Sequence, residues 1–274
     1  MIEQLHNKKL DHECFPQPVD DSVRVWRYLD LAKFTWLLEK QKLYFSRLDL
    51  LNDSHEGSVP KFIAEQYDKQ ILNFIDASLM QKYENDLGNP QYKAEKERFA
   101  ENLHQMRIRK QSDRRLIYVN CWYLGNQESE AMWRLYCPGN NGVAIQTSYG
   151  KLVKSVENDE GLFIGCVTYI DYDRQGFPLG NIFYPVMHKR ISFAHEQEMR
   201  MVKIQLPENF GMQNEVCNSG IAFEWPVEPV IEAIYVDPYA PEYFFDAVSA
   251  IVRSIAPNLL NRLHWSKMRA LPIY

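Results

Sequence analysis

Short apolar segments of strand-like composition alternate with helical patterns along most of the chain. β-Branched and aromatic residues predict strands over the ranges 23–29, 42–48, 114–124, 143–148, 162–172 and 230–238. Apolar residues at helical spacing predict helices over 31–41, with Asp30 at the N-cap position, over 128–137, and from Pro241 to about Ala256. This order predicts an α+β fold with a mixed, mostly antiparallel central sheet and flanking helices.

A pair of helices is expected to interrupt the sheet. Apolar side chains recur every four residues within 60–87, which predicts an amphipathic helix: Ile63, Tyr67, Ile71, Ile75, Leu79 and Tyr83. The turn "NDLGNP" ends this pattern, and a mostly polar helix is expected over 91–111. We therefore predict a helical insertion at about 60–112. Residues 1–21 are polar and are interpreted as an N-terminal tail that docks late, if at all, which leaves 22–274 as a single domain.

Composition limits the possible classes of protein. Of 274 residues 46% are hydrophobic, which is enough for a core and argues against disorder. The net charge of −5 gives no global indication of a nucleic-acid or anionic-membrane binder. The five cysteines are widely spaced without a CxxC pair, which favours reduced thiols. No signal-peptide pattern and no apolar run of about 18–20 residues is present, so we expect a cytoplasmic protein without a membrane segment.

The stretch "FAHEQEMRMVKI" (193–204) carries the first candidate for chemistry. Glu196, Glu198 and Arg200 recur at period two, and in a strand they would all point to the same face. The face could be the floor of a catalytic cleft, where a carboxylate stabilises a cationic sugar transition state. It could equally be an exposed ladder of charges worth little energy.

The first predicted strand, "VRVWRYL", carries a second candidate. Alternation places Arg24 and Tyr28 on one face and Arg27 on the other, with Val23 and Val25. An arginine on an apolar face needs a partner or a ligand. Arg27 could therefore clamp a phosphate or carboxylate, or it could form an internal ion pair with a glutamate.

Polar residues gather in "LYFSRLDLLNDSHEG" (43–57). Tyr44 and Ser46 share a strand face, and a polar loop that includes Asn52 follows. Asp53, His55 and Glu56 could ligate a metal, but their spacing matches no metal signature and an Asx-turn explains them as well. We expect no metal here.

Aromatic and basic residues offer two weaker candidates. Trp133 and Tyr136 could stack on a base or on nicotinamide, although Trp133 at this helical spacing is more often a core residue. The basic run at 107–115 could contact a nucleic-acid backbone, or it could be a solvated helix end.

Taken in order, these motifs resemble the bacterial domain-of-unknown-function family 2971 over about 24–240. The residues that carry the resemblance are Tyr28, Asn52, Asp53, Glu56, Trp133, Tyr136, Glu196, Glu198 and Arg200. The "N-D-P-F-E" form of the family is "N-D-S-H-E" here, and Phe193 stands three residues before Glu196. The resemblance implies a bacterial protein and an association with phage defence or toxin-like genes.

The order of parts also resembles, more distantly, the ADP-ribosyltransferase fold. This resemblance implies that Arg27 or Arg24 clamps the NAD phosphate and that Ser46 or Tyr44 flanks the nicotinamide ribose. It further implies that Glu198 holds the ribose hydroxyl and that Glu196 orients the acceptor. Tyr136 or Trp133 would stack on nicotinamide. The remaining residues expected to contribute to NAD binding are Tyr28, Asn52, Asp53, Glu56 and Arg200.

Three functions follow as hypotheses. The first is an ADP-ribosyltransferase-like toxin or defence effector that uses NAD as substrate and a nucleic acid or protein as acceptor. It predicts that Glu198→Gln abolishes NAD consumption with little loss of stability. The second is a metal-dependent nuclease or phosphodiesterase built on Asp53, His55, Glu56 and the acidic pair. The third is a non-catalytic nucleotide- or partner-binding module.

Overall fold

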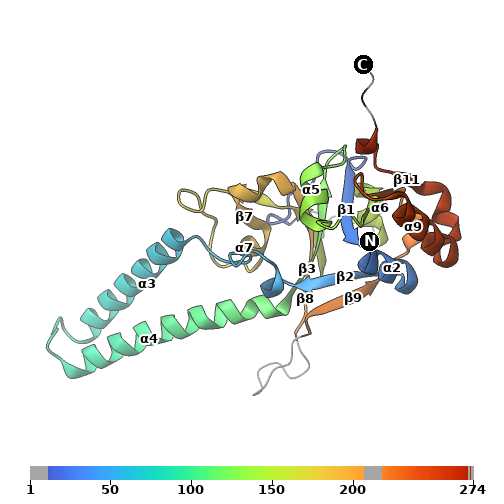
Figure 1. Cartoon of the computed structure of the whole chain (residues 1–274). Helices are drawn as coiled ribbons and strands as arrows, with labels where there is room; N and C mark the ends of the chain where they lie inside the picture. The colour runs from blue at the N-terminus through green and yellow to red at the C-terminus, as the bar shows by residue number, and fades with distance from the viewer. Residues whose placement is uncertain (1–11, 207–217, 271, 273–274) are drawn as a thin grey trace.

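The structure is a mixed α+β arrangement built on one large, mostly antiparallel sheet (Figure 1). A computed structural model describes residues 12–206, 218–270 and 272. Within these residues nine strands form the sheet, in the order β11–β10–β4–β1–β3–β2–β9, and β8 and β5 branch from β3. Their bounds are β1 (Arg24–Asp30), β2 (Lys42–Arg47), β3 (Ile117–Leu124), β4 (Gly142–Ser148), β5 (Leu162–Cys166), β8 (Glu198–Ile204), β9 (Gly220–Glu224), β10 (Ala233–Val236) and β11 (Leu263–Trp265).

Helices and a small parallel pair of strands complete the fold. The pair is β6 (Thr168–Ile170) and β7 (His188–Arg190). The α-helices are α2 (Leu31–Lys40), α3 (Lys61–Lys82), α4 (Pro90–Asp113), α5 (Glu130–Tyr136), α6 (Tyr149–Ser155), α7 (Phe183–Met187), α8 (Val227–Val230) and α9 (Glu242–Ile255). The 3₁₀ helices are η1 (Leu48–Leu50), η2 (Arg114–Leu116), η3 (Ile191–Glu196), η4 (Pro257–Arg262) and η5 (Lys267–Arg269). None of the helices in the described ranges combines the length and apolar character needed to cross a bilayer.

Strand β3 is the point at which the sheet splits. One edge of β3 pairs with β8 from Ile117 to Tyr123. The other edge pairs with β1 only through Tyr123 and Leu124, and with β2 only through Tyr118 and Val119. Because β1 and β2 diverge between these points, residues 120–122 face a gap rather than a neighbouring strand on this side.

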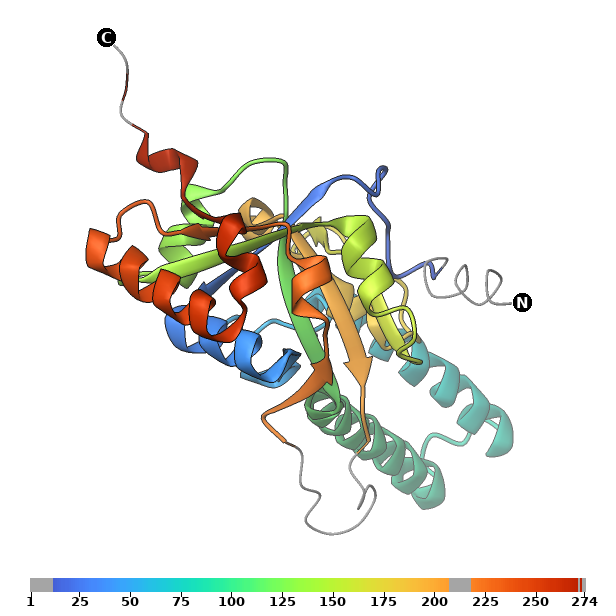
Figure 2. The same cartoon turned by 90° about the vertical axis from the view of Figure 1, so that its right-hand side faces the viewer.

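The main core lies on one face of the sheet, where α2, α6 and α9 pack. Figure 2 shows α2 and α9 beside each other on this face. Strand β1 contributes Val25 and Leu29, because alternate residues of a strand share a face. Asp30 caps α2 as expected, since its side chain accepts a hydrogen bond from the Lys33 amide at 2.8 Å. On the opposite face α5 packs against Trp26 and Tyr28.

The predicted helical insertion is present as α3 and α4, which form a hairpin that projects from the sheet (Figure 1). The two helices are tied to each other by polar contacts. Tyr92 donates to Asp76 at 2.6 Å, and Lys82 pairs with Glu95 at 2.8 Å. Of the periodic apolar residues of α3, Leu79 is buried and Tyr67 is 43% exposed.

Several element boundaries differ from those predicted. The first three residues of the range 114–124 form η2, and the range 230–238 becomes a strand only at Ala233. The range 162–172 is broken at Val167 into β5 and β6, because the Val167 amide donates to the Glu198 carbonyl and β6 then pairs with β7. Sequence patterns also missed α6, β9 and β11.

The described part of the N-terminal segment is packed, contrary to our expectation of a loosely docked tail. Residues 1–11 lie outside the described residues, but Cys14 and Phe15 are buried. The Phe15 ring stacks on Phe163 with centroids 5.1 Å apart. A Cβ placed on Gly165 would lie 2.7 Å from the Phe15 backbone, so only glycine allows this close approach.

Candidate functional site

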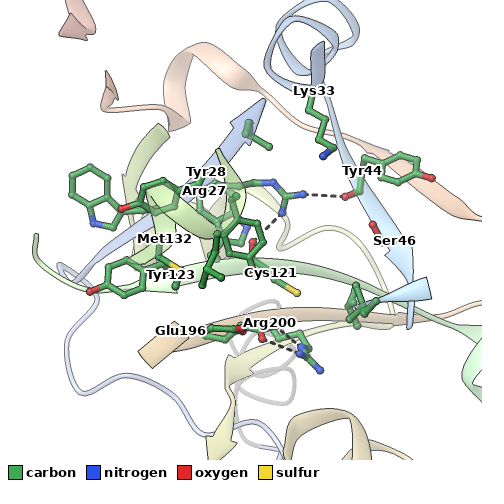
Figure 3. Close-up of a pocket in the computed structure, with 18 of the residues that line it drawn as sticks. Arg27, Tyr28, Lys33, Tyr44, Ser46, Cys121, Tyr123, Met132, Glu196 and Arg200 are labelled. Carbon is green, nitrogen blue, oxygen red and sulfur yellow. Dashed lines mark hydrogen bonds and ion pairs between the residues drawn. The ribbon is translucent and has the colours of Figure 1, made fainter. Parts of the chain in front are cut away.

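A cavity of about 760 Å³ lies where β1 and β2 diverge along β3 (Figure 3). Its lining comes from these three strands, from α2 and α5, from the loop after η1, and from the segment 189–200. Most of the residues singled out in the sequence line it: Arg27, Tyr28, Tyr44, Ser46, Asn52, Asp53, Glu56, Tyr136, Glu196, Glu198 and Arg200. Segments far apart in the chain thus meet at the split of the sheet.

Two predicted site residues lie elsewhere. Arg24 is exposed on the other face of β1 from Arg27 and donates to the Asn126 carbonyl at 3.3 Å. Trp133 is buried in the core between α5 and the sheet, edge-to-face with Tyr28 at 4.9 Å between ring centroids. Of the residues proposed to stack on a ring, Tyr136 reaches the cavity, and its side chain is about half exposed.

The acidic stretch at the start of β8 is buried rather than exposed. Glu198 and Arg200 share a strand face, as predicted, and are 5% and 0% exposed. Glu196 does not belong to the strand: it ends η3, and Gln197 turns the chain in the left-handed region with φ of 38°. The prediction that all three residues lie on one strand is therefore wrong, although Glu196 is also buried and joins the same cluster.

Arg200 is the anchor of this cluster. Its Nε and Nη2 donate to the two oxygens of Glu198 at 2.6 and 2.9 Å. Its Nη1 and Nη2 donate to the two oxygens of Glu56 at 3.0 and 3.3 Å, and Nη1 also donates to the Val186 carbonyl at 2.6 Å. All five N–H groups of the guanidinium thus have an acceptor.

Lys189, in the middle of β7, completes the cluster. Its Nζ lies 2.6 Å from Glu196 Oε2, 3.0 Å from Glu56 Oε1 and 3.4 Å from Glu198 Oε2. Three carboxylates therefore share two cations, and the ionised cluster carries one net negative charge.

The two glutamates at the start of β8 have opposite pKa shifts. Burial raises the pKa of Glu198, but the charge and hydrogen bonds of Arg200 and the charge of Lys189 outweigh it, so that this pKa lies well below its ordinary value. Burial raises the pKa of Glu196 above its ordinary value, because Lys189 offsets only part of the desolvation and of the repulsion from nearby carboxylates. Glu198 is thus a fixed anion whose oxygens are occupied. Glu196 lines the cavity, and its Oε1 has no hydrogen-bond partner among the described residues.

Arg27 forms the opposite wall of the cavity. Figure 3 shows Arg27 and Tyr44 on one side, and Glu196 with Arg200 on the other. The guanidinium donates to the Cys121 carbonyl at 3.1 Å and the Tyr44 carbonyl at 3.5 Å, across the gap between the strands. No carboxylate of the described chain lies within ion-pair distance of it, so the alternative of an internal ion pair finds no support among the described residues. Burial lowers the pKa of Arg27, because desolvation disfavours its charged form.

The polar loop after η1 is held by ion pairs. Asp53 accepts from the His55 amide at 3.0 Å, which is the expected Asx-turn, and from Arg190 at 2.7 Å. Glu56 is bound by Arg200 and Lys189. Within the described ranges no group of three or more His, Cys, Asp or Glu side chains is arranged to hold a metal ion. The carboxylates suggested as metal ligands therefore have arginine and lysine as partners.

Residues from the sheet centre were missed by sequence reasoning. Cys121 and Tyr123 of β3 line the cavity and lie opposite Arg200 and Glu198 in register. Only the pairing of β3 with β8 brings them there, and no sequence pattern specified that register. Burial strongly raises the pKa of the Cys121 thiol, with a further contribution from the charge of Glu198, so this cysteine is not an activated nucleophile. The described cysteines are free thiols, and Cys217 lies outside the described residues.

Lys189 was also missed by sequence reasoning, because the sequence around it indicates a buried lysine only weakly. It stands between His188 and Arg190 in a three-residue strand, where a run of basic residues usually indicates a solvated segment. Its burial depends on glutamates that lie in three other segments of the chain.

Comparison of the chain with protein-family models, with curated proteins and with solved structures finds no match.

Proposed function

We propose that the cavity binds NAD⁺ and that the protein is an ADP-ribosyltransferase-like enzyme, which transfers ADP-ribose and releases nicotinamide. The observation that carries this proposal is the charge arrangement of the cavity. Arg27, without a carboxylate partner among the described residues, stands opposite a buried cluster with one net negative charge. NAD⁺ combines an anionic diphosphate with a cationic nicotinamide ring, which suits these two walls. The volume of about 760 Å³ lies in the range usual for small-molecule sites.

The roles of the residues follow from their remaining hydrogen-bonding capacity. Arg27 uses two of its N–H groups on backbone carbonyls, and the others, which have no acceptor in the described part of the chain, would bind a phosphate oxygen. Tyr44 and Ser46 come from the adjacent strand, where they would flank the ribose. Tyr136, half exposed at the cavity, offers a face on which the nicotinamide ring would stack.

The structure supports a different division of work between the two glutamates from the one that the resemblance implied. Both oxygens of Glu198 accept hydrogen bonds from Arg200, so its carboxylate supplies negative charge rather than a new contact. Glu196 keeps one oxygen without a hydrogen-bond partner among the described residues. We assign to Glu196 the direct contact with the ribose or the acceptor, and to Glu198 the fixed charge behind it.

The proposed reaction uses this charge. The bond between the ribose C1′ and the nicotinamide nitrogen breaks, and its electron pair neutralises the pyridinium ring. Positive charge then develops on the ribose, where a preorganised carboxylate stabilises it. The acceptor forms a bond to C1′ and loses a proton, for which the raised pKa of Glu196 makes this carboxylate a suitable base. A role as a toxin or phage-defence effector rests on the family resemblance alone and stays a prediction.

The test is mass spectrometry of NAD⁺ incubated with the pure protein and cell extract. Glu196→Gln is expected to lower nicotinamide release by about 100-fold or more, the usual cost of removing one transition-state contact. Glu39→Gln, on the exposed side of α2, is the matched control and is expected to react like wild type. Saturable NAD⁺ binding without turnover would instead favour the non-catalytic module. Phosphodiester cleavage that is lost with a chelator would favour the metal-dependent nuclease.

A further inference from the structure

Lys189 has a contact pattern that the proposed reaction does not explain. Its side chain is 8% exposed, and its ammonium contacts glutamates from three segments: Glu56 after η1, Glu196 in η3 and Glu198 in β8. An ammonium has three N–H donors, so one donor is available for each carboxylate. A buried lysine with three acidic partners is a costly arrangement that a solvated strand does not require.

The contact with Glu196 is different from the other two. Arg200 binds Glu56 through Nη1 and Nη2 and Glu198 through Nε and Nη2, so each of these carboxylates has a second cation. Glu196 has Lys189, and no other cation of the described chain lies within ion-pair distance of it. The shortest of the three lysine contacts, 2.6 Å, is also the one to Glu196.

We propose that Lys189 is a positioning residue, which holds the Glu196 carboxylate ionised and leaves its second oxygen directed to the cavity. The catalytic consequence rests on the proposed function, but the charge state of Glu196 can be measured without it. Lys189 does not act as a nucleophile, because burial lowers its pKa less than the surrounding glutamates raise it, and it stays protonated.

The groups around Glu196 determine in which direction its pKa moves when Lys189 is removed. Burial opposes the ionisation of Glu196 most strongly, and the charges of Glu198 from β8 and Glu56 from the loop oppose it further. Tyr136 of α5 and Tyr169 of β6 are neutral phenols near it. Lys189 of β7 is the group that favours the anion. Without this lysine, Arg200 would still bind Glu56 and Glu198, but Glu196 would have no cation of the described chain within ion-pair distance. Glu196 would therefore be the first to take up a proton.

The test is a pH titration of the full chain by ¹³C NMR with glutamate labelled at the carboxyl carbon. The Glu196 signal is identified by its absence in Glu196→Gln. In Lys189→Met its titration midpoint is expected to rise by at least about one pH unit, and in Lys189→Arg, which keeps the charge, to return towards wild type. Lys203→Met is the matched control, because Lys203 is also a partly buried lysine, paired with Asp159 at 2.5 Å. An unchanged midpoint in Lys189→Met would overturn the proposal.

Two further measurements separate this inference from the proposed function. Circular dichroism verifies that Lys189→Met is folded, and Lys189→Gln, which keeps a polar end without charge, replaces it if it is not. The pH dependence of nicotinamide release is expected to shift upwards in the same variants as the NMR midpoint. A shifted midpoint in a protein without NAD⁺ turnover would refute the proposed function and leave the role of Lys189 intact. NAD⁺ turnover together with an unshifted midpoint and an unshifted pH profile would support the proposed function and refute the role of Lys189.

Discussion

Removal of Arg200 tests the buried charge cluster in a way that does not depend on any assay of activity. Arg200 is 0% exposed and uses all five N–H groups, four of them on the carboxylates of Glu56 and Glu198. In Arg200→Met these two carboxylates stay buried, and with Glu196 they share Lys189 alone. Removing one partner of a buried ion pair lowers the free energy of unfolding by about 3–5 kcal/mol, because the other charge is left without compensation.

The expected result is a loss of about 3–5 kcal/mol in the free energy of unfolding, equivalent to a melting temperature lower by about 10 °C. Urea denaturation, followed by tryptophan fluorescence and circular dichroism, measures it, with the slope compared between variants. Lys151→Met is the matched control. Its ion pair with Glu232 is similar in length, 2.7 Å, but half exposed, so its loss is expected to cost about 0–1 kcal/mol.

A double variant measures the coupling between Arg200 and Glu198. Arg200→Met combined with Glu198→Gln removes one stranded charge together with the cation, so its cost should be smaller than the sum of the two single costs. Equal costs for Arg200→Met and Lys151→Met would show that the cluster is not a buried network of charges. Strict additivity in the double variant would refute the coupling between Arg200 and Glu198.

Three further outcomes follow from the structure. In Glu198→Gln we expect a loss of stability at pH 7, because the depressed pKa of Glu198 contributes stability above about pH 4.3 that wild type loses as the pH falls towards 2. Glu196 has a raised pKa, so Glu196→Gln should be at least as stable as wild type at pH 7. Thermal melting from pH 3 to 8 compares the two variants. Phe15→Ala should cost about 3–5 kcal/mol in urea denaturation, since Phe15 is 1% exposed, and a cost below 1 kcal/mol would show that the N-terminal segment is loosely attached. Asp30→Ala should lower the free energy of unfolding by about 1 kcal/mol through loss of the α2 cap. Asp30→Asn, whose side chain can also cap the helix, should keep most of the wild-type stability.

Local sequence patterns predicted those parts of the fold that short-range physics controls. The strand-then-cap pattern around Asp30 was confirmed, and so were the mostly antiparallel sheet with its flanking helices and the helix pair at about 60–112. Helix α6 was missed although Ser148 gives an N-cap signal, because the helix follows β4 without a turn. The ADP-ribosyltransferase-like assignment stays a prediction.

The site was predicted in its residue types and missed in its geometry. Period two placed Glu198 and Arg200 on one face, but the left-handed turn at Gln197, which moves Glu196 off the strand, has no signal in the sequence. The three-way contact of Lys189 depends on long-range packing. The expectation that Glu198→Gln would cost little stability overlooked the same network, because a pattern of residues does not reveal which carboxylate has its oxygens occupied.

The central claim is that the cavity at the split of the sheet binds NAD⁺ through Arg27, and calorimetric titration of NAD⁺ tests it most directly. Arg24 provides the matched control, since it lies on the same strand but outside the cavity. We predict saturable binding by wild type and by Arg24→Met, and at least tenfold weaker binding by a folded Arg27→Met. Wild-type protein that binds no NAD⁺, or equal affinities for the two arginine variants, would contradict the account.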